Sequence, residues 1–205
     1  MTTPYACTTY YRLKPHVKIL TDTAKILFRY LKNPRQMGTV CPSSRFLAKK
    51  MVSGINRKCG VIVELGPGTG AITKHLVDSG LAKDCKLYCI EFDSSLIPHL
   101  ERKFPSAKIV NGSAEDLRDI VGADTARICA VVSSLPLISL PKEVVHKILS
   151  EVEAALPAGG RFIQFTYNLK RSPVRMGFEK MRHIDASKVF MNIPPARVDV
   201  FEKIS

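Results

Sequence analysis

Apolar positions along the chain follow two spacings, one typical of buried strands and the other of amphipathic helices. Residues 61–63 form a continuous apolar run, which leads through Glu64 and Leu65 into a turn with glycine at positions 66, 68 and 70. Residues 71–77 then follow a helical spacing. A strand, a tight glycine turn and a helix are the first half of a βαβ unit, so the sequence predicts an α/β fold.

Later apolar runs predict more strands and the helices that connect them. We expect strands at residues 86–91, 107–111, 127–133 and 161–167, and helices at 45–51, 94–103, 142–156 and from Glu115 onward. The run 127–133 is almost entirely apolar, as in a central parallel strand that helices cover on both faces. The last two runs, 187–193 and 197–204, flank Pro194 and Pro195, which favours an antiparallel pair at one edge of the sheet.

The glycine turn predicts a binding site for a nucleotide-type ligand. Gly66, Gly68 and Gly70 would let the backbone adopt positive φ and approach a ligand, with the amides of the next helix facing it. A dinucleotide fingerprint reads G-x-G-x-x-G, whereas here the glycines alternate and Glu64 precedes them. An acid at this place suits an amino group, such as that of S-adenosylmethionine, and would repel a pyrophosphate. Glu91 ends the second strand, where a dinucleotide fold places a carboxylate on ribose hydroxyls; an exposed glutamate in a salt bridge is the alternative.

Two other segments are expected near this site. The carboxyl ends of strands are where open α/β sheets bind ligands, so the turn that begins at Ser133 and Ser134 should border the reaction centre. Residues 35–44 are rich in turn-forming residues and precede the glycine turn. They could fold over a ligand as a lid, or they could simply connect two helices.

Residues 1–34 are expected to form a separate N-terminal unit. Residues 1–15 have no periodicity and predict a loose arm, whereas residues 16–32 have the spacing of a helix. This helix has two apolar patches beside a narrow basic stripe, which consists of Lys18, Lys25, Arg29 and Lys32. The pattern fits a helix that docks on the domain and also contacts lipid, or else one that is buried on two sides.

The distribution of charge indicates a polyanionic partner. The chain has 205 residues, a net charge of +13 and 45% hydrophobic residues, which is enough for one sizeable core. Residues 1–50 carry ten Lys and Arg against one acid, residues 161–205 nine against four, and the central part twelve against thirteen. Basic ends around a neutral core favour binding to nucleic acid or an anionic membrane, with a merely solubilising surface as the alternative.

The sequence also predicts several absences. The six cysteines form no C-x-x-C pair and no framework spacing, so we expect buried structural thiols and no metal site. The longest uncharged run, residues 128–141, is too short to cross a bilayer, and the first residues lack the apolar core of a signal peptide. These features predict a cytoplasmic protein without a membrane span.

Strand by strand, the sequence resembles a class I S-adenosylmethionine-dependent methyltransferase, with residues 64–70 as its first motif. The resemblance implies a Rossmann-like fold, in which a seven-stranded, mostly parallel sheet has an antiparallel last strand and an amphipathic helix lies at the N-terminus. Within this superfamily the chain is similar to the bacterial phospholipid N-methyltransferases, which methylate phosphatidylethanolamine. The segments that carry this closer similarity are residues 36–44, 134–137, 162–167 and 192–198.

The resemblance implies contacts to S-adenosyl-L-methionine, with S-adenosyl-L-homocysteine as the product. Glu64 and the backbone around the glycines would hold the methionine part, Glu91 the ribose, and Ser113 and Ala114 would lie beside the adenine. Many relatives have an acid at the position of Ser113. The other residues assigned to the cofactor are Gln36, Gly38, Thr39, Ser43, Ser44, Gly66, Gly68, Gly70, Phe92 and Ser133.

The expected reaction is methylation of the phosphatidylethanolamine amine toward phosphatidylcholine, at the inner face of the cell membrane. Residues 1–34 would bind anionic lipids, and residues 35–205 would form the methyltransferase domain. The amine is mostly protonated at neutral pH, and no His-Asp spacing or carboxylate pair in the sequence indicates a strong base. The residues expected to contact the amine are Tyr30, Ser134 and Tyr167, and those expected to hold the lipid phosphate are Arg171, Arg175, Lys180 and His183.

A ribosomal RNA adenine methyltransferase is the main alternative, because such enzymes share the glycine turn and the basic charge. They typically have Asn-Leu-Pro-Tyr or Asn-Leu-Pro-Phe after the fourth strand, where the ring stacks on a flipped base. Residues 134–137 supply neither the amide nor the ring, and no appended RNA-binding domain is expected, so we predict no nucleic acid partner. A membrane module without activity would conflict with the intact Glu64, Glu91 and glycines.

Overall fold

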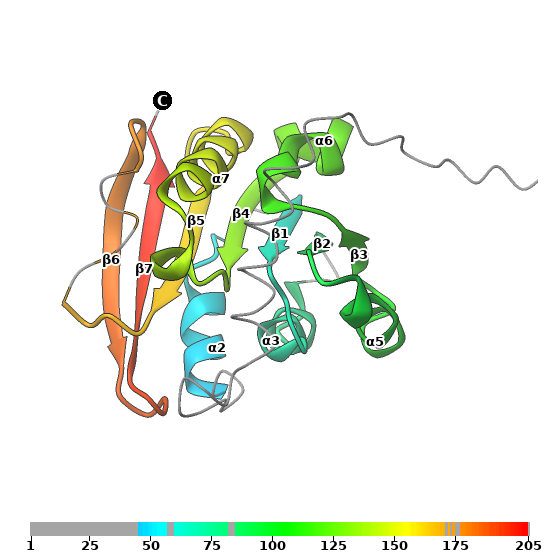
Figure 1. The fold of residues 1–205 in the computed structure, drawn as a ribbon, viewed down its shortest axis with the longest axis horizontal. Coiled ribbons are helices and arrows are strands. Elements are labelled where there is room, and N and C mark those ends of the chain that lie inside the picture. Colours follow the sequence, from blue (N-terminus) through cyan, green and yellow to red (C-terminus); the bar gives the residue numbers. More distant parts are fainter. Residues whose placement is uncertain are drawn as a thin grey trace, which may run out of the picture.

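The computed structural model describes residues 45–56, 60–81, 85–170, 172, 174 and 177–204 of the chain (Figure 1). The N-terminal arm, the helix at 16–32 and the segment 35–44 lie outside these residues, so the expectations for them stay predictions. Within the described part of the chain, no helix has both the length and the apolar character that a membrane span requires.

Seven strands form one sheet in the order β3-β2-β1-β4-β5-β7-β6 (Figure 1). Neighbouring strands from β3 to β5 are parallel, and β7 is antiparallel to both β5 and β6. The strands are β1 (Val61–Leu65), β2 (Lys86–Glu91), β3 (Lys108–Asn111), β4 (Ile128–Ser133), β5 (Arg161–Thr166), β6 (Met181–Val189) and β7 (Ala196–Lys203). The mostly parallel sheet and its antiparallel last strand confirm the predicted fold class.

Helices cover both faces of this sheet. The apolar sides of α2 (Arg45–Ser53) and α3 (Ala71–Asp78) pack on one face, and those of α6 (Leu117–Val121) and α7 (Lys142–Ala155) pack on the other. Because both faces are covered, all five residues of β1 are buried. The remaining described helices are α5 (Ile97–Lys103), which lies beside β3, and the short 3-10 helices η2 (Ser94–Leu96), η3 (Ala114–Asp116), η4 (Gly122–Arg127) and η5 (Leu137–Ser139).

Most predicted elements lie within two residues of their observed bounds, but the sixth strand begins much earlier than the sequence indicates. β6 runs from Met181 to Val189, whereas the apolar pattern predicts a strand at residues 187–193, so residues 190–193 lie in the turn after the strand instead. Its residues alternate between exposed and partly buried positions and many are polar, so the apolar pattern is weak there. Hydrogen bonds to β7 along its length impose the strand geometry instead.

The three cysteines among the described residues differ in whether they form a disulfide. Cys85 and Cys89 are buried thiols, as expected. Cys129 is disulfide-bonded, which corrects that expectation at this position. Spacing along the chain does not show which cysteines meet in space, so the sequence could not indicate the bond.

One end of the sheet, which we call its carboxyl end, carries the ends of all the parallel strands. Leu65 at the end of β1 pairs with Ser133 at the end of β4. Thr166 at the end of β5 pairs with Arg197 near the start of β7, so the turn between β6 and β7 lies at this same end (Figure 1). The glycine turn, the turns after β4 and β5, and residues 190–195 therefore all lie at the same end of the sheet.

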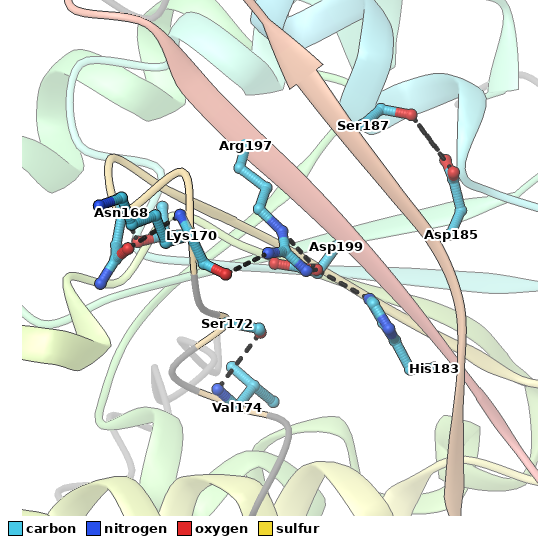
Figure 2. A network of polar contacts seen from close by, with 10 residues as sticks. Asn168, Lys170, Ser172, Val174, His183, Asp185, Ser187, Arg197 and Asp199 are labelled. Carbon is cyan, nitrogen blue, oxygen red and sulfur yellow. Dashed lines mark hydrogen bonds and ion pairs between the residues drawn. The ribbon is translucent and has the colours of Figure 1, made fainter.

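A polar network joins β6 and β7 on the face that α7 covers (Figure 2). Asp199 is fully buried, and its Oδ1 lies 2.8 Å from His183 Nε2 and accepts hydrogen bonds from Arg197 Nε (3.0 Å) and Nη2 (2.6 Å). Arg197 Nη1 also donates to the carbonyl oxygen of Lys170 (3.3 Å). The network thereby holds the segment after β5 against β7.

Candidate functional site

The glycine turn after β1 adopts the left-handed backbone that its sequence predicts. Gly66, Gly68 and Gly70 have φ values of 70°, 58° and 81°. A Cβ at Gly66 would lie 2.7 Å from the end of the Leu135 side chain, and one at Gly70 would lie 2.2 Å from a ring carbon of Phe104, so either would displace its neighbour. The positive φ also favours glycine at both positions. A Cβ at Gly68 would meet no atom within 4 Å. The open side of the turn is therefore at Gly68, where a ligand can approach the backbone.

Glu91 holds this turn against the end of β2. Its carboxylate is buried; Oε2 accepts a hydrogen bond from Gly68 N (2.9 Å) and Oε1 accepts one from Asp93 N (2.8 Å). Each carboxylate oxygen can accept a further hydrogen bond, so the predicted ribose contact of Glu91 is compatible with this arrangement and stays a prediction. Sequence reasoning missed the contact with Gly68, because a separation of 23 residues along the chain has no recognisable spacing.

Glu64 lies beneath the turn and is fully buried beside α3. Its Oε2 accepts hydrogen bonds from Thr73 Oγ1 (2.7 Å) and Cys89 Sγ (3.5 Å), whereas Oε1 has no hydrogen-bond partner among the described residues. Burial raises the pKa of Glu64 to about 7, and the hydrogen bonds from Thr73 and Cys89 offset only part of that rise. The carboxyl group therefore joins α3 to β1, and Oε1 is the atom left for the predicted contact with an amino group.

Side chains of β4 and β5 hold the turn after β4. Ser133 is fully buried, and its Oγ accepts a hydrogen bond from Leu135 N (3.3 Å). Gln164 Nε2 donates a hydrogen bond to the carbonyl oxygen of Leu135 (3.1 Å). Ser134 N donates one to the carbonyl oxygen of Leu65, the last residue of β1 (2.9 Å). Leu135 in turn lies over Gly66, so the turns after β1 and β4 form one packed unit. The role of Gln164 was missed, because only the pairing of β5 with β4 brings it there.

The ends of β2 and β3 carry the residues predicted to lie beside the adenine. Asn111 Nδ2 donates to the carbonyl oxygens of the last residue of β2 (2.9 Å) and of Phe92 (3.1 Å), and the Phe92 ring is partly exposed. Ser113 Oγ accepts a hydrogen bond from Glu115 N (3.2 Å) and so caps η3, which begins at Ala114. The structure brings Phe92, Ser113 and Ala114 to the carboxyl end of the sheet, as the prediction requires.

The residues predicted to contact the substrate divide into two groups. Ser134 and Tyr167 follow the ends of β4 and β5, and the Tyr167 ring is 46% exposed. Lys180 lies at the opposite end of the sheet, since its carbonyl oxygen accepts a hydrogen bond from Ile204 N (2.9 Å), just beyond β7. His183 also lies toward that end, because it pairs with Phe201, which pairs with the second residue of β5, and its Nε2 contacts Asp199. The structure therefore does not bring Lys180 or His183 together with Ser134 and Tyr167.

Several predicted site residues cannot be placed. Those that lie outside the described residues are Tyr30, Gln36, Gly38, Thr39, Ser43, Ser44, Arg171 and Arg175, and their roles stay predictions. In the part of the chain that the structure describes, no group of three or more His, Cys, Asp or Glu side chains could hold a metal ion.

Comparisons with known proteins extend over both the glycine turn and the strands around it. Residues 62–160 match the family model described as a methyltransferase domain. The chain is 31% identical over 186 residues to an ornithine lipid N-methyltransferase from Singulisphaera acidiphila, which covers 86% of this chain and 94% of that relative. It is 40% identical over only 75 residues to a ribosomal RNA small subunit methyltransferase A from Sulfurihydrogenibium sp., which covers 36% of this chain and 28% of that relative.

A solved structure of similar fold holds a cofactor product. The N-methyltransferase NodS from Bradyrhizobium japonicum, in complex with S-adenosyl-L-homocysteine, has a TM-score of 0.62 at 13% sequence identity, over 89% of this chain and 99% of that chain. This structure shows the same fold. Membership of the methyltransferase family confirms the prediction that S-adenosyl-L-methionine is the methyl donor. The open side of the turn at Gly68 fits a cofactor that approaches the backbone closely.

Alanine substitutions at Gly68 and Gly70 should have different effects. Gly68→Ala has space for its methyl group, so we expect a folding cost of about 1 kcal/mol from the positive φ and at least about a tenfold loss of S-adenosyl-L-homocysteine affinity. Gly70→Ala would press its methyl group against Phe104, and we expect a cost of about 3 kcal/mol in the free energy of unfolding. Urea unfolding and titration calorimetry measure both effects. Wild-type affinity in Gly68→Ala would show that the cofactor does not bind at the open side of the turn.

The raised pKa of Glu64 predicts that folding depends on pH. The folded protein holds this proton more tightly than the unfolded chain, because the pKa rises from 4.5 to about 7. Its contribution is fully present below about pH 4.5 and is lost as pH rises through about 7, a change of about 3 kcal/mol. Between about pH 5 and pH 8, the free energy of unfolding should therefore fall more in the wild type than in Glu64→Gln, whose amide does not titrate. Urea unfolding at both pH values tests this, and equal falls in the two proteins would contradict it.

Proposed function

Because the chain belongs to the class I S-adenosylmethionine-dependent methyltransferases, we propose that it transfers methyl groups to the amine of a membrane lipid. The observation that carries this proposal is the extent of the similarity to the ornithine lipid N-methyltransferase. That similarity covers 186 residues, well beyond the methyltransferase core at residues 62–160. Similarities to ribosomal RNA small subunit methyltransferases from several organisms cover 36–58% of this chain and 25–49% of each relative, so they support the shared cofactor site and not RNA as the substrate.

Phosphatidylethanolamine is the substrate that we propose, with successive methylation toward phosphatidylcholine. The resemblance of residues 36–44, 134–137, 162–167 and 192–198 to phospholipid N-methyltransferases supports this choice. Ornithine lipid is the second candidate, because the ornithine lipid N-methyltransferase matches 86% of this chain. Both lipids present an amine, so in either case the nucleophile is an amine nitrogen that must lose a proton before it attacks the methyl group.

The residues at the carboxyl end of the sheet can hold and orient these reactants. Glu64, Glu91 and the open side of the turn at Gly68 would hold S-adenosyl-L-methionine, which supplies an electrophilic methyl group when it is bound. Carbonyl groups of the turn after Ser133 and the hydroxyl of Tyr167 would accept hydrogen bonds from the amine and align its lone pair. The amine must first lose a proton, which we propose passes to water as the site removes the amine from solvent.

Contact with the membrane is a further part of this proposal. Residues 1–34 would place a basic, amphipathic helix on anionic lipids at the inner face of the cell membrane. Each basic residue near such a surface contributes about 1 kcal/mol of binding free energy. We propose Tyr30 as a contact to the amine and Arg171 and Arg175 as contacts to the lipid phosphate. Lys180 and His183 are left out, because both lie toward the other end of the sheet.

The substrate can be identified by following a labelled methyl group. We expect label from S-adenosyl-L-methionine in phosphatidylethanolamine vesicles, and none in vesicles of phosphatidylcholine, which lacks a methylatable amine. Ornithine lipid vesicles and total RNA are assayed in parallel, and the lipid and RNA fractions are counted separately. Label in ornithine lipid alone would support lipid N-methylation and would show that the substrate is ornithine lipid and not phosphatidylethanolamine. Label in RNA alone would overturn the proposal.

The N-terminal contact needs a separate measurement in the full-length chain. Replacing Lys18, Lys25, Arg29 and Lys32 by glutamine should lower binding to anionic vesicles by about tenfold or more, because four charges are removed from the membrane surface. Vesicle flotation with and without anionic lipid measures the change. Equal flotation of the variant and the wild type would show that this helix is not an electrostatic anchor.

A further inference from the structure

Exposed apolar side chains gather at the carboxyl end of the sheet. Among the described residues, nine large apolar side chains are exposed, and six of them either follow a strand that ends there or lie in the turn between β6 and β7. These six are Phe92, Ile138, Tyr167, Phe190, Met191 and Ile193. A group of apolar side chains at one end of a molecule indicates an interaction surface, whereas scattered single ones are ordinary.

The turn between β6 and β7, residues 190–195, is the most apolar part of this end. Phe190, Met191 and Ile193 are each 67% exposed, the largest values among the exposed apolar side chains of the described residues. Asn192 between them is buried, and its Nδ2 donates a hydrogen bond to the carbonyl oxygen of Pro194 (2.7 Å). This hydrogen bond stabilises the turn in a conformation that leaves the three apolar side chains exposed to solvent.

The charge around the turn favours an anionic partner. No acid occurs in the sequence between Asp185 and Asp199, and this stretch includes the exposed Lys188. An exposed apolar tip beside an exposed basic residue fits a segment that enters the boundary between lipid head groups and acyl chains. A partner with only a negative surface would leave the three apolar side chains in water.

We infer that the β6–β7 turn inserts Phe190, Met191 and Ile193 into an anionic lipid bilayer. The turn lies at the same end of the sheet as the glycine turn and the turns after β4 and β5 (Figure 1). Insertion would therefore set the site against the membrane surface, so that a lipid amine could reach it while the acyl chains stay in the bilayer. The choice of a lipid partner rests on the proposed function.

The chain has no tryptophan, so a single introduced tryptophan reports its own surroundings. Phe190→Trp places the reporter in the turn, and Ile204→Trp is the matched control, because Ile204 is an exposed apolar residue beyond the other end of β7. Each full-length variant is mixed with vesicles of phosphatidylcholine and phosphatidylglycerol, with and without brominated acyl chains. We expect emission of Phe190→Trp to shift to shorter wavelength and to be quenched by the brominated chains, and emission of Ile204→Trp to stay unchanged.

A triple variant with serine at Phe190, Met191 and Ile193 tests the affinity. Because these side chains are exposed, its melting curve should match that of the wild type, while binding to vesicles should fall by about tenfold or more. An unchanged Phe190→Trp spectrum, or unchanged binding of the triple variant, would overturn the inference. A Phe190→Trp spectrum that shifts with protein concentration in the absence of vesicles would also overturn it, in favour of a second copy of the chain. Quenching without methylation of any lipid would support insertion and refute the proposed function.

Discussion

The hydrogen bond from the Gly68 amide to the Glu91 carboxylate is the contact on which the site depends. It joins the turn after β1 to the end of β2 across 23 residues of sequence. The turn can make this bond because its backbone is left-handed at three glycines, two of which lie closely against neighbouring side chains. Glu91 is buried, and hydrogen bonds from the backbone amides of Gly68 and Asp93 offset the free-energy cost of removing its carboxylate from water. Turn and carboxylate therefore stabilise each other.

A second carboxyl group lies under the same turn in a very different environment. Glu64 is fully buried, and its pKa is raised to about 7, mainly because burial disfavours the charged form. Glu91 is also acidic and adds a small repulsion in the same direction. A buried carboxyl group with one unpartnered oxygen among the described residues is costly to the fold alone. Its presence directly beneath the turn is what a site for an amino group would require.

The arrangement of the carboxyl end also bears on how the lipid substrate that we propose would reach the cofactor. The central part of the chain is nearly neutral, whereas both ends of the sequence are basic. The last strands come from one of these basic ends, and they place an apolar turn at the same end of the sheet as the site. A lipid enzyme needs such a surface near its reaction centre, because taking the acyl chains out of the bilayer would expose apolar surface to water.

The sequence by itself determined the parallel core and the cofactor turn, because these depend on local signals. Continuous apolar runs indicate buried strands, and Gly66, Gly68 and Gly70 indicate a left-handed turn whatever lies around them. The start of β6, the Asp199 network and the support of the β4 turn by Gln164 were decided by the tertiary structure alone. Each of these depends on pairing between strands that are distant or weakly patterned in sequence, and no local spacing records which residues such pairing brings together.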